Sequence, residues 1–250
     1  MPITFQKAVE HPQSVRRVVV WPRWGLIDAV IALAGFSIVT LAVGLPLWYF
    51  NAPLEIVILV GGTAPWLMLG GWPIIATRIR GNGARIDLGI VLRWSDVGWG
   101  VLFGVAGLIA AAFGAVITTY FVGDFNSAAG EAALALKESS SFAAIFVFAI
   151  MIAVGAPVVE ELAFRGLLYG SLRKIGKAGL NSAWVILITA VAFALFHLEP
   201  TRFLVLFPIG LALGLARWKT QALGAPMIAH LVNNLPAAVF LLIGTAEVTP

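Results

Sequence analysis

Two adjacent glutamates, two histidines and an asparagine stand in apolar stretches of this 250-residue sequence. Glu160 and Glu161 end one stretch, His197 ends a second, and His230 and Asn234 lie four residues apart in a third. A carboxylate shielded from bulk water beside an imidazole is suited to act as a general base, and imidazole and amide N–H groups can stabilise an oxyanion. The pattern therefore predicts activation of water for attack on a carbonyl group.

The spacing within the first stretch assigns different partners to the two glutamates. On an α-helix Glu161 and Arg165 are one turn apart and can pair, whereas Glu160 points about 100° away from Glu161. We therefore predict that Glu161 and Arg165 form a structural pair and that Glu160 is the reactive carboxylate. The non-catalytic interpretations are an ordinary ion pair at a helix end and histidines that only form hydrogen bonds between helices.

The composition places these residues in a membrane. Hydrophobic residues make up 60% of the chain, charged residues only 11%, and the mean hydropathy is +0.98, far from the composition of soluble domains. The apolar runs are long enough to cross a hydrocarbon core as helices, and too long and continuous for barrel strands. We predict an all-α polytopic bundle of about seven transmembrane helices near 26–49, 55–77, 97–122, 142–172, 181–198, 203–217 and 224–244. An eighth, re-entrant or split element is an open alternative, because glycine and proline interrupt the second run.

Lysine and arginine are concentrated on one side of this bundle. All but two of the 16 basic residues lie on the side of the amino terminus, and the exceptions are Lys137 and Arg202. The positive-inside rule then puts the N-terminus in the cytoplasm and the C-terminus outside the cell membrane. We predict that residues 1–24 form a basic cytoplasmic tail without a cleaved signal peptide, and that residues 25–250 form a single transmembrane domain. The positive charge is scattered and forms no stripe, which argues against nucleic-acid binding.

Other polar and aromatic residues have structural interpretations. Asn233 is predicted to make a packing contact, Glu199 and Arg202 are predicted to pair in an outer loop, and Asp28 matches no motif. The chain has no cysteine, which excludes disulfides and thiolate chemistry. Tryptophans at the ends of the predicted spans are expected to anchor the helices among lipid headgroups; these are Trp21, Trp24, Trp48, Trp94, Trp99 and Trp218.

Three sequence elements, in this order, resemble the CAAX-protease and bacteriocin-processing (CPBP) family, also called the Abi family. The family's elements are Glu-Glu-x-x-x-Arg, Phe-x-x-x-His and His-x-x-x-Asn, and here they are Glu160-Glu161 to Arg165, Phe193 to His197, and His230 to Asn234. The resemblance covers about residues 142–244, the expected protease-like core. It implies an intramembrane endopeptidase in which Glu160 and His197 activate water. By the same resemblance, His230 and Asn234 bind the oxyanion, and Glu161, Arg165 and Phe193 support the site.

The resemblance also implies a substrate class and a location. Substrates would be hydrophobic or membrane-anchored peptides, the surroundings would be membrane lipids, and the family and chain length favour a bacterial cytoplasmic membrane. Glu160, His197 and His230 could ligate a zinc ion and leave one position for water. The chain lacks a His-Glu-x-x-His helix, so we favour metal-free water activation and leave zinc as the alternative.

Two other functional classes stay open. The same buried residues could relay protons in a proton-coupled membrane transporter, although the sequence has no paired inverted repeats of the kind found in many transporters. The chain could also be a non-catalytic membrane scaffold that retains the fold. Intact motif residues argue against the scaffold.

Overall fold

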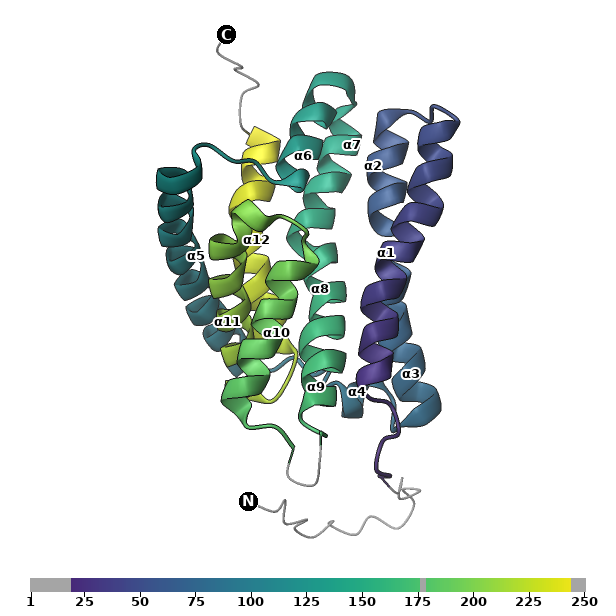
Figure 1. Cartoon of the computed structure of the whole chain (residues 1–250), viewed down its shortest axis with the longest axis vertical. Coiled ribbons are helices and arrows are strands. Elements are labelled where there is room, and N and C mark those ends of the chain that lie inside the picture. The colour runs from purple at the N-terminus through teal and green to yellow at the C-terminus, as the bar shows by residue number, and fades with distance from the viewer. Residues whose placement is uncertain (1–18, 176–178, 244–250) are drawn as a thin grey trace.

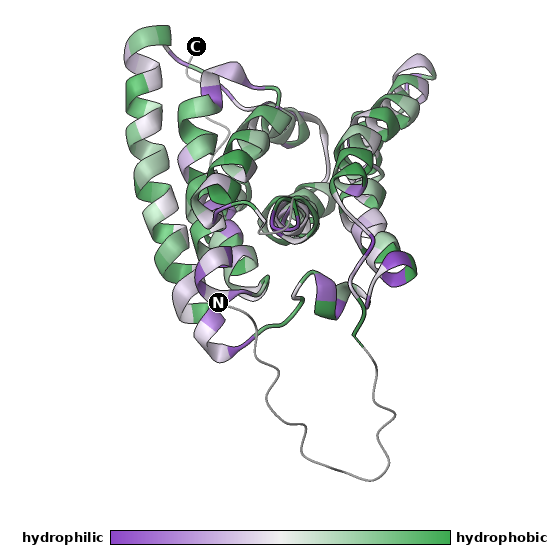
Figure 2. Cartoon of the chain, turned by 60° about the horizontal axis from the view of Figure 1, so that its bottom comes forward, coloured by the Kyte–Doolittle hydropathy of each residue, from purple (hydrophilic) through white to green (hydrophobic). Residues whose placement is uncertain are grey.

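The computed structural model describes residues 19–175 and 179–243, and within these residues the chain forms helices and no strand (Figure 1). Hydrophobic residues cover the sides of the helices, and hydrophilic residues gather mainly at helix ends and connections (Figure 2). The predicted all-α membrane bundle is therefore confirmed. Most of the predicted tail, residues 1–18, lies outside the described residues, as do Lys177 and residues 244–250.

Within the described residues, six helical segments are long and apolar enough to cross a membrane. The first is α1 (Leu26–Tyr49), and the second joins α2 (Leu54–Thr63), the π-helix η1 (Leu67–Gly71) and α3 (Trp72–Arg80). The third is α5 (Trp94–Val122). The fourth joins α7 (Phe142–Ile150), the π-helix η2 (Met151–Gly155), α8 (Ala156–Glu161), the π-helix η3 (Leu162–Leu168) and α9 (Tyr169–Leu172). The fifth joins the 3₁₀ turn η4 (Pro200–Arg202) to α11 (Phe203–Thr220), and the sixth is α12 (Gly224–Ile243).

The span predicted at 181–198 is shorter than expected. Its helix α10 (Ser182–Phe196) has 15 residues, which gives a length of about 22 Å against the roughly 30 Å of a hydrocarbon core. The bundle therefore consists, in the described residues, of six full-length spans and one short helix. The second span remains one segment, in which the π-helical turn η1 contains Gly70 and Gly71, and Pro73 follows at the start of α3.

Two short helices mark the opposite ends of the bundle. α4 (Ala84–Asp87) lies near the connection from α9 to α10 (Figure 1); we call this end the basic end, because Arg80, Arg85 and Lys174 belong to it. α6 (Ala128–Ser139) lies in the predicted outer loop at the other end, which we call the α6 end. The turn between α10 and α11 stops short of the tips of α6 and α7 (Figure 1), so α6 extends beyond the α10–α11 hairpin.

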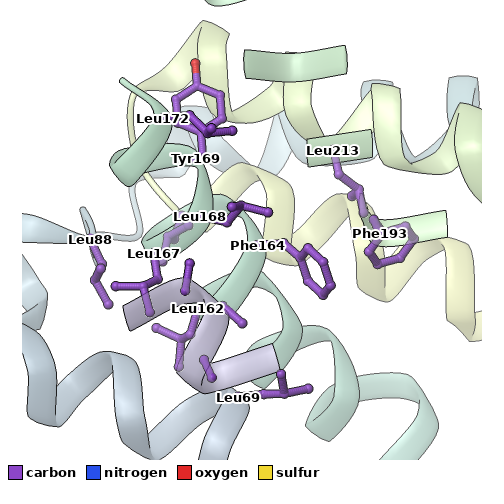
Figure 3. Close-up of a cluster of buried hydrophobic side chains, with 14 of the residues drawn as sticks. Leu69, Leu88, Leu162, Phe164, Leu167, Leu168, Tyr169, Leu172, Phe193 and Leu213 are labelled. Carbon is purple, nitrogen blue, oxygen red and sulfur yellow. The ribbon is translucent and has the colours of Figure 1, made fainter. Parts of the chain in front are cut away.

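The hydrophobic core is built around the fourth span. Phe164 and Leu167 of η3 are fully buried together with Leu69 of η1 and Leu213 of α11 (Figure 3). π-Helical turns are rare and concentrate at functional sites. Here η2 and η3 flank α8, the short α-helix that carries the two glutamates.

Glycine lets α5 and α11 approach closely. A Cβ added at Gly114 of α5 would overlap the carbonyl oxygen of Leu204, and a helix backbone cannot rotate away as a side chain can. We expect Gly114→Ala to destabilise the protein by about 1–3 kcal/mol. Gly44→Ala in α1 is the matched control, because it meets open space and gains helix propensity. Equal unfolding temperatures of the two variants in detergent would contradict this close packing.

Trp24 is buried, contrary to its predicted role as a headgroup anchor. Its side chain is 3% exposed, its indole N–H donates to Asp87 at 2.8 Å, and the Lys174 ammonium lies 3.1 Å from the ring centroid. Trp21 and Trp94, by contrast, are largely exposed. Through these contacts, Trp24 links the segment before α1 to α4 and to the residues after α9.

Partial burial lowers the pKa of Lys174 to about 8, and the Asp87 carboxylate opposes this shift. Because the pKa is 10.5 without burial, the unfolded chain binds more protons between these values, and the contribution of Lys174 to stability rises as pH increases from about 8 to 10.5. In NMR spectra of ¹³C-methylated protein, one lysine signal should titrate with a midpoint of about 8. Lys174→Arg should remove that signal, and a midpoint above pH 10 would contradict the burial.

Candidate active site

Glu161 is the buried centre of the polar cluster. Its side chain is fully buried, and its Oε1 atom accepts from Arg165 Nη1 at 2.9 Å and lies 2.9 Å from His230 Nδ1. The predicted pair of Glu161 and Arg165 is therefore present. The contact with His230 was not foreseen, because sequence spacing predicts partners within one helix and not across two.

Arg165 ties this cluster to the neighbouring helices. Its second terminal nitrogen donates to the carbonyl oxygen of Gly210 in α11 at 3.0 Å, and its guanidinium carbon lies 4.6 Å from the ring centroid of Phe193 in α10. The side chain is fully buried. A buried charge of this kind is tolerated only when it is paired and hydrogen-bonded, so Glu161 and the Gly210 carbonyl hold Arg165 in the bundle.

Glu160 lies on α8 beside Glu161 but faces elsewhere. Its Oε2 atom lies 3.8 Å from Nε2 of His230, too far for a hydrogen bond. Oε2 is shielded from solvent and has no hydrogen-bond partner within the described residues. An unpartnered buried carboxylate oxygen calls for an explanation, such as a catalytic role or an ordered water. The α-helical turn at 156–161 thus separates a bonded carboxylate from an unbonded one, as the spacing predicted.

His197 follows the last residue of α10 and is held there by its own backbone. Its Nδ1 atom lies 2.8 Å from the carbonyl oxygen of Phe193. Because a carbonyl oxygen only accepts hydrogen bonds, Nδ1 carries the hydrogen, and in the neutral imidazole Nε2 keeps the lone pair. The Phe-x-x-x-His spacing therefore fixes the tautomer of the histidine that the sequence predicted to assist water activation.

Phe193 stands between the two histidines. Its ring centroid lies 4.8 Å from that of His197 and 5.5 Å from that of His230, and both contacts are edge-on. The ring is buried and also packs edge-on against Phe164 at 5.4 Å. Phe193 thus fixes both imidazoles against one aromatic surface.

The two asparagines of α12 make different contacts. Asn234 donates through Nδ2 to the carbonyl oxygen of Ile152 at 2.9 Å, a carbonyl in the π-helix η2. Asn233 donates to Gly104 in α5 at 3.1 Å and to Ala229 at 2.8 Å, which confirms its predicted packing contact. One N–H of Asn234 remains available in this arrangement.

Glu160, His197, His230 and Asn234 line one cavity of about 680 Å³. The structure therefore brings the four predicted catalytic residues to a common space, from α8, the end of α10, and α12. This volume is within the range of small-molecule and peptide pockets.

The predicted outer-loop pair of Glu199 and Arg202 is also present.

Arg202 also lines this cavity, a position that sequence reasoning missed. Arg202 ends the 3₁₀ turn η4 directly before α11, and no sequence motif indicates that this turn faces the site. The only signal was that Arg202 is one of two basic residues on the sparsely charged side of the bundle.

The three residues considered as zinc ligands do not form a metal site. Within the described residues, no group of three or more histidine, cysteine, aspartate or glutamate side chains is arranged to hold a metal ion. His230 directs Nδ1 to Glu161 and Nε2 toward Glu160, an orientation that metal-bound histidines also adopt, so the spacing of the three side chains decides the question. The donor set of Glu160, His197 and His230 therefore does not fit a three-ligand zinc site in this arrangement.

One of the comparisons with known proteins gives a match. Residues 142–236 match the family described as type II CAAX prenyl endopeptidase Rce1-like. This range contains the two glutamates, both histidines and the asparagine of the cavity. No curated protein and no solved structure gives a significant match to the chain.

Proposed function

We propose that this chain is an intramembrane endopeptidase that cleaves hydrophobic or membrane-anchored peptides; its residues 142–236 match the Rce1-like family of type II CAAX prenyl endopeptidases. The family match points to a CAAX protease-type hydrolase. The residue roles and the substrate class belong to our proposal. One observation carries it: Glu160, His197, His230 and Asn234 line a single cavity inside the bundle.

In the proposed reaction the Glu160 carboxylate accepts a proton from a water molecule, and the oxygen of that water attacks the peptide carbonyl carbon. His197 orients the water through Nε2, the nitrogen with the lone pair. The C–N bond of the tetrahedral intermediate then breaks, and the proton held by Glu160 passes to the leaving amine. One water is consumed, and one carboxylic acid and one amine are formed.

The oxyanion of this intermediate requires hydrogen-bond donors. Asn234 offers the N–H that is not bonded to Ile152. Because His230 directs Nδ1–H to Glu161, its donor to the oxyanion is Nε2–H, and this hydrogen exists together with Nδ1–H only in the imidazolium form.

The test is a library of hydrophobic peptides incubated with the purified protein in detergent, with the products identified by mass spectrometry. We expect cleavage that is lost in His197→Ala, because the attacking water loses its orienting acceptor. Proton flux in proteoliposomes without any peptide cleavage would instead support the transporter. If the protein shows neither peptide cleavage nor proton flux, the non-catalytic scaffold is the class that remains, and the proposal is overturned.

A further inference from the structure

The cavity is lined from one end of the bundle only. The α5–α6 connection contributes Asn126 and Ser127, α6 contributes Ala129, and the last turn of α12 contributes Phe240. None of its lining residues comes from α4 or from the described parts of the α9–α10 and α11–α12 connections, which form the basic end. The walls therefore continue from the catalytic residues toward the α6 end.

Buried side chains pack beside the site in the direction of the basic end. Phe164 and Leu167 follow the two glutamates along the fourth span toward α9, and both are fully buried in one cluster with Leu213 (Figure 3). Arg165, between them in the chain, is also fully buried. Protein interiors of this kind are close-packed and leave few voids larger than a water molecule. A separate, smaller cavity of about 180 Å³ lies toward the basic end beside Pro157 and Met227, and none of the four catalytic candidates lines it.

At the α6 end, polar contacts hold the start of α6 at the edge of the cavity. The backbone N–H of Ala128, the first residue of α6, donates to Glu199 Oε1 at 2.6 Å, and the other carboxylate oxygen of Glu199 bonds Arg202. Asn126 and Ala129 are exposed although they line the cavity. The edge of the cavity beside α6 is therefore exposed at the surface of the protein.

We propose that substrate reaches the site from the α6 end. The basic end faces the cytoplasm by the positive-inside rule, so the α6 end lies on the extracytoplasmic side. The substrates are therefore hydrophobic peptide segments on the extracytoplasmic side of the membrane. This inference rests on the proposed endopeptidase function. It assigns the enzyme to secreted peptides or to the outer ends of membrane segments. Prenylated tails in the cytoplasm would not have access to the cavity.

Single cysteines test this sidedness directly, because the natural chain contains none. Ala129→Cys places a thiol at the exposed edge of the cavity, and Arg85→Cys, exposed in α4, is the matched control at the basic end. In sealed right-side-out membrane vesicles, a membrane-impermeant maleimide should label Ala129→Cys and remove most of its cleavage activity. Arg85→Cys should be labelled only after permeabilisation, with its activity unchanged.

A charged, membrane-impermeant fluorogenic peptide supplies the second readout. Intact right-side-out vesicles should cleave it, and inside-out vesicles should cleave it only after detergent is added. Cleavage by intact inside-out vesicles, or labelling of Arg85→Cys from outside, would overturn the sidedness while leaving the endopeptidase in place. Absence of cleavage in detergent would overturn the endopeptidase itself, and this inference with it.

Discussion

Replacing Glu160 with glutamine is expected to lower kcat for peptide cleavage by about 10²–10⁴-fold, the range contributed by a general base, while the unfolding temperature stays close to that of the wild type. The amide has nearly the same shape but cannot accept the proton of the attacking water. Stability should change little, because Glu160 Oε2 has no hydrogen-bond partner in the described part of the chain. Rates on one defined peptide and thermal unfolding in the same detergent measure both effects.

Glu55→Gln in the first turn of α2 is the control for this prediction, since it makes the same chemical change at a residue that does not line the cavity. It should retain wild-type cleavage. A Glu160→Gln variant that keeps more than half of the wild-type kcat would remove Glu160 from the chemistry. Loss of activity together with unfolding would show that its role is structural.

The largest effect on stability is expected from Glu161→Ala. This substitution leaves the Arg165 guanidinium buried without a counter-charge and removes the partner of His230 Nδ1. Breaking a buried pair by removing one member typically costs about 3–5 kcal/mol. The free energy of unfolding should fall by this amount, and cleavage should fall as well because His230 is no longer held.

The double variant Glu161→Leu/Arg165→Met separates the buried charge from the lost packing. With both charges replaced by apolar side chains, the protein should be more stable than Glu161→Ala and still deficient in cleavage. If Glu161→Ala and the double variant were equally unstable, the uncompensated charge of Arg165 would not be the cause. Unfolding curves of the three proteins in one detergent make the comparison.

Much of the site could be predicted from residue spacing. The i to i+4 pair of Glu161 and Arg165 and the divergence of Glu160 both follow from the geometry of a single α-helical turn. The runs of apolar residues likewise located the spans, because a hydrocarbon core requires long apolar helices. These features depend on residues close together in the chain.

Contacts between helices could not be predicted in this way. Which helix faces which is decided by side-chain packing, so the bond between Glu161 and His230 and the bond between Asn234 and Ile152 appear only in the folded bundle. The same holds for Trp24, whose position at a span end does not distinguish a lipid-facing ring from one packed on Asp87. The short α10 was predicted as a full span because the apolar run continues into His197 and the turn that follows it.

The most direct test of the central claim, that Glu160 and His197 act on one water molecule in a shared cavity, is the rate of cleavage by the double variant Glu160→Gln/His197→Ala beside the two single variants. Residues that act as a unit give strongly non-additive losses. We predict that the double variant cleaves a defined peptide no more than a few-fold more slowly than the slower single variant. Losses that multiply would mean that the two side chains act in separate steps or sites, and would contradict this mechanism.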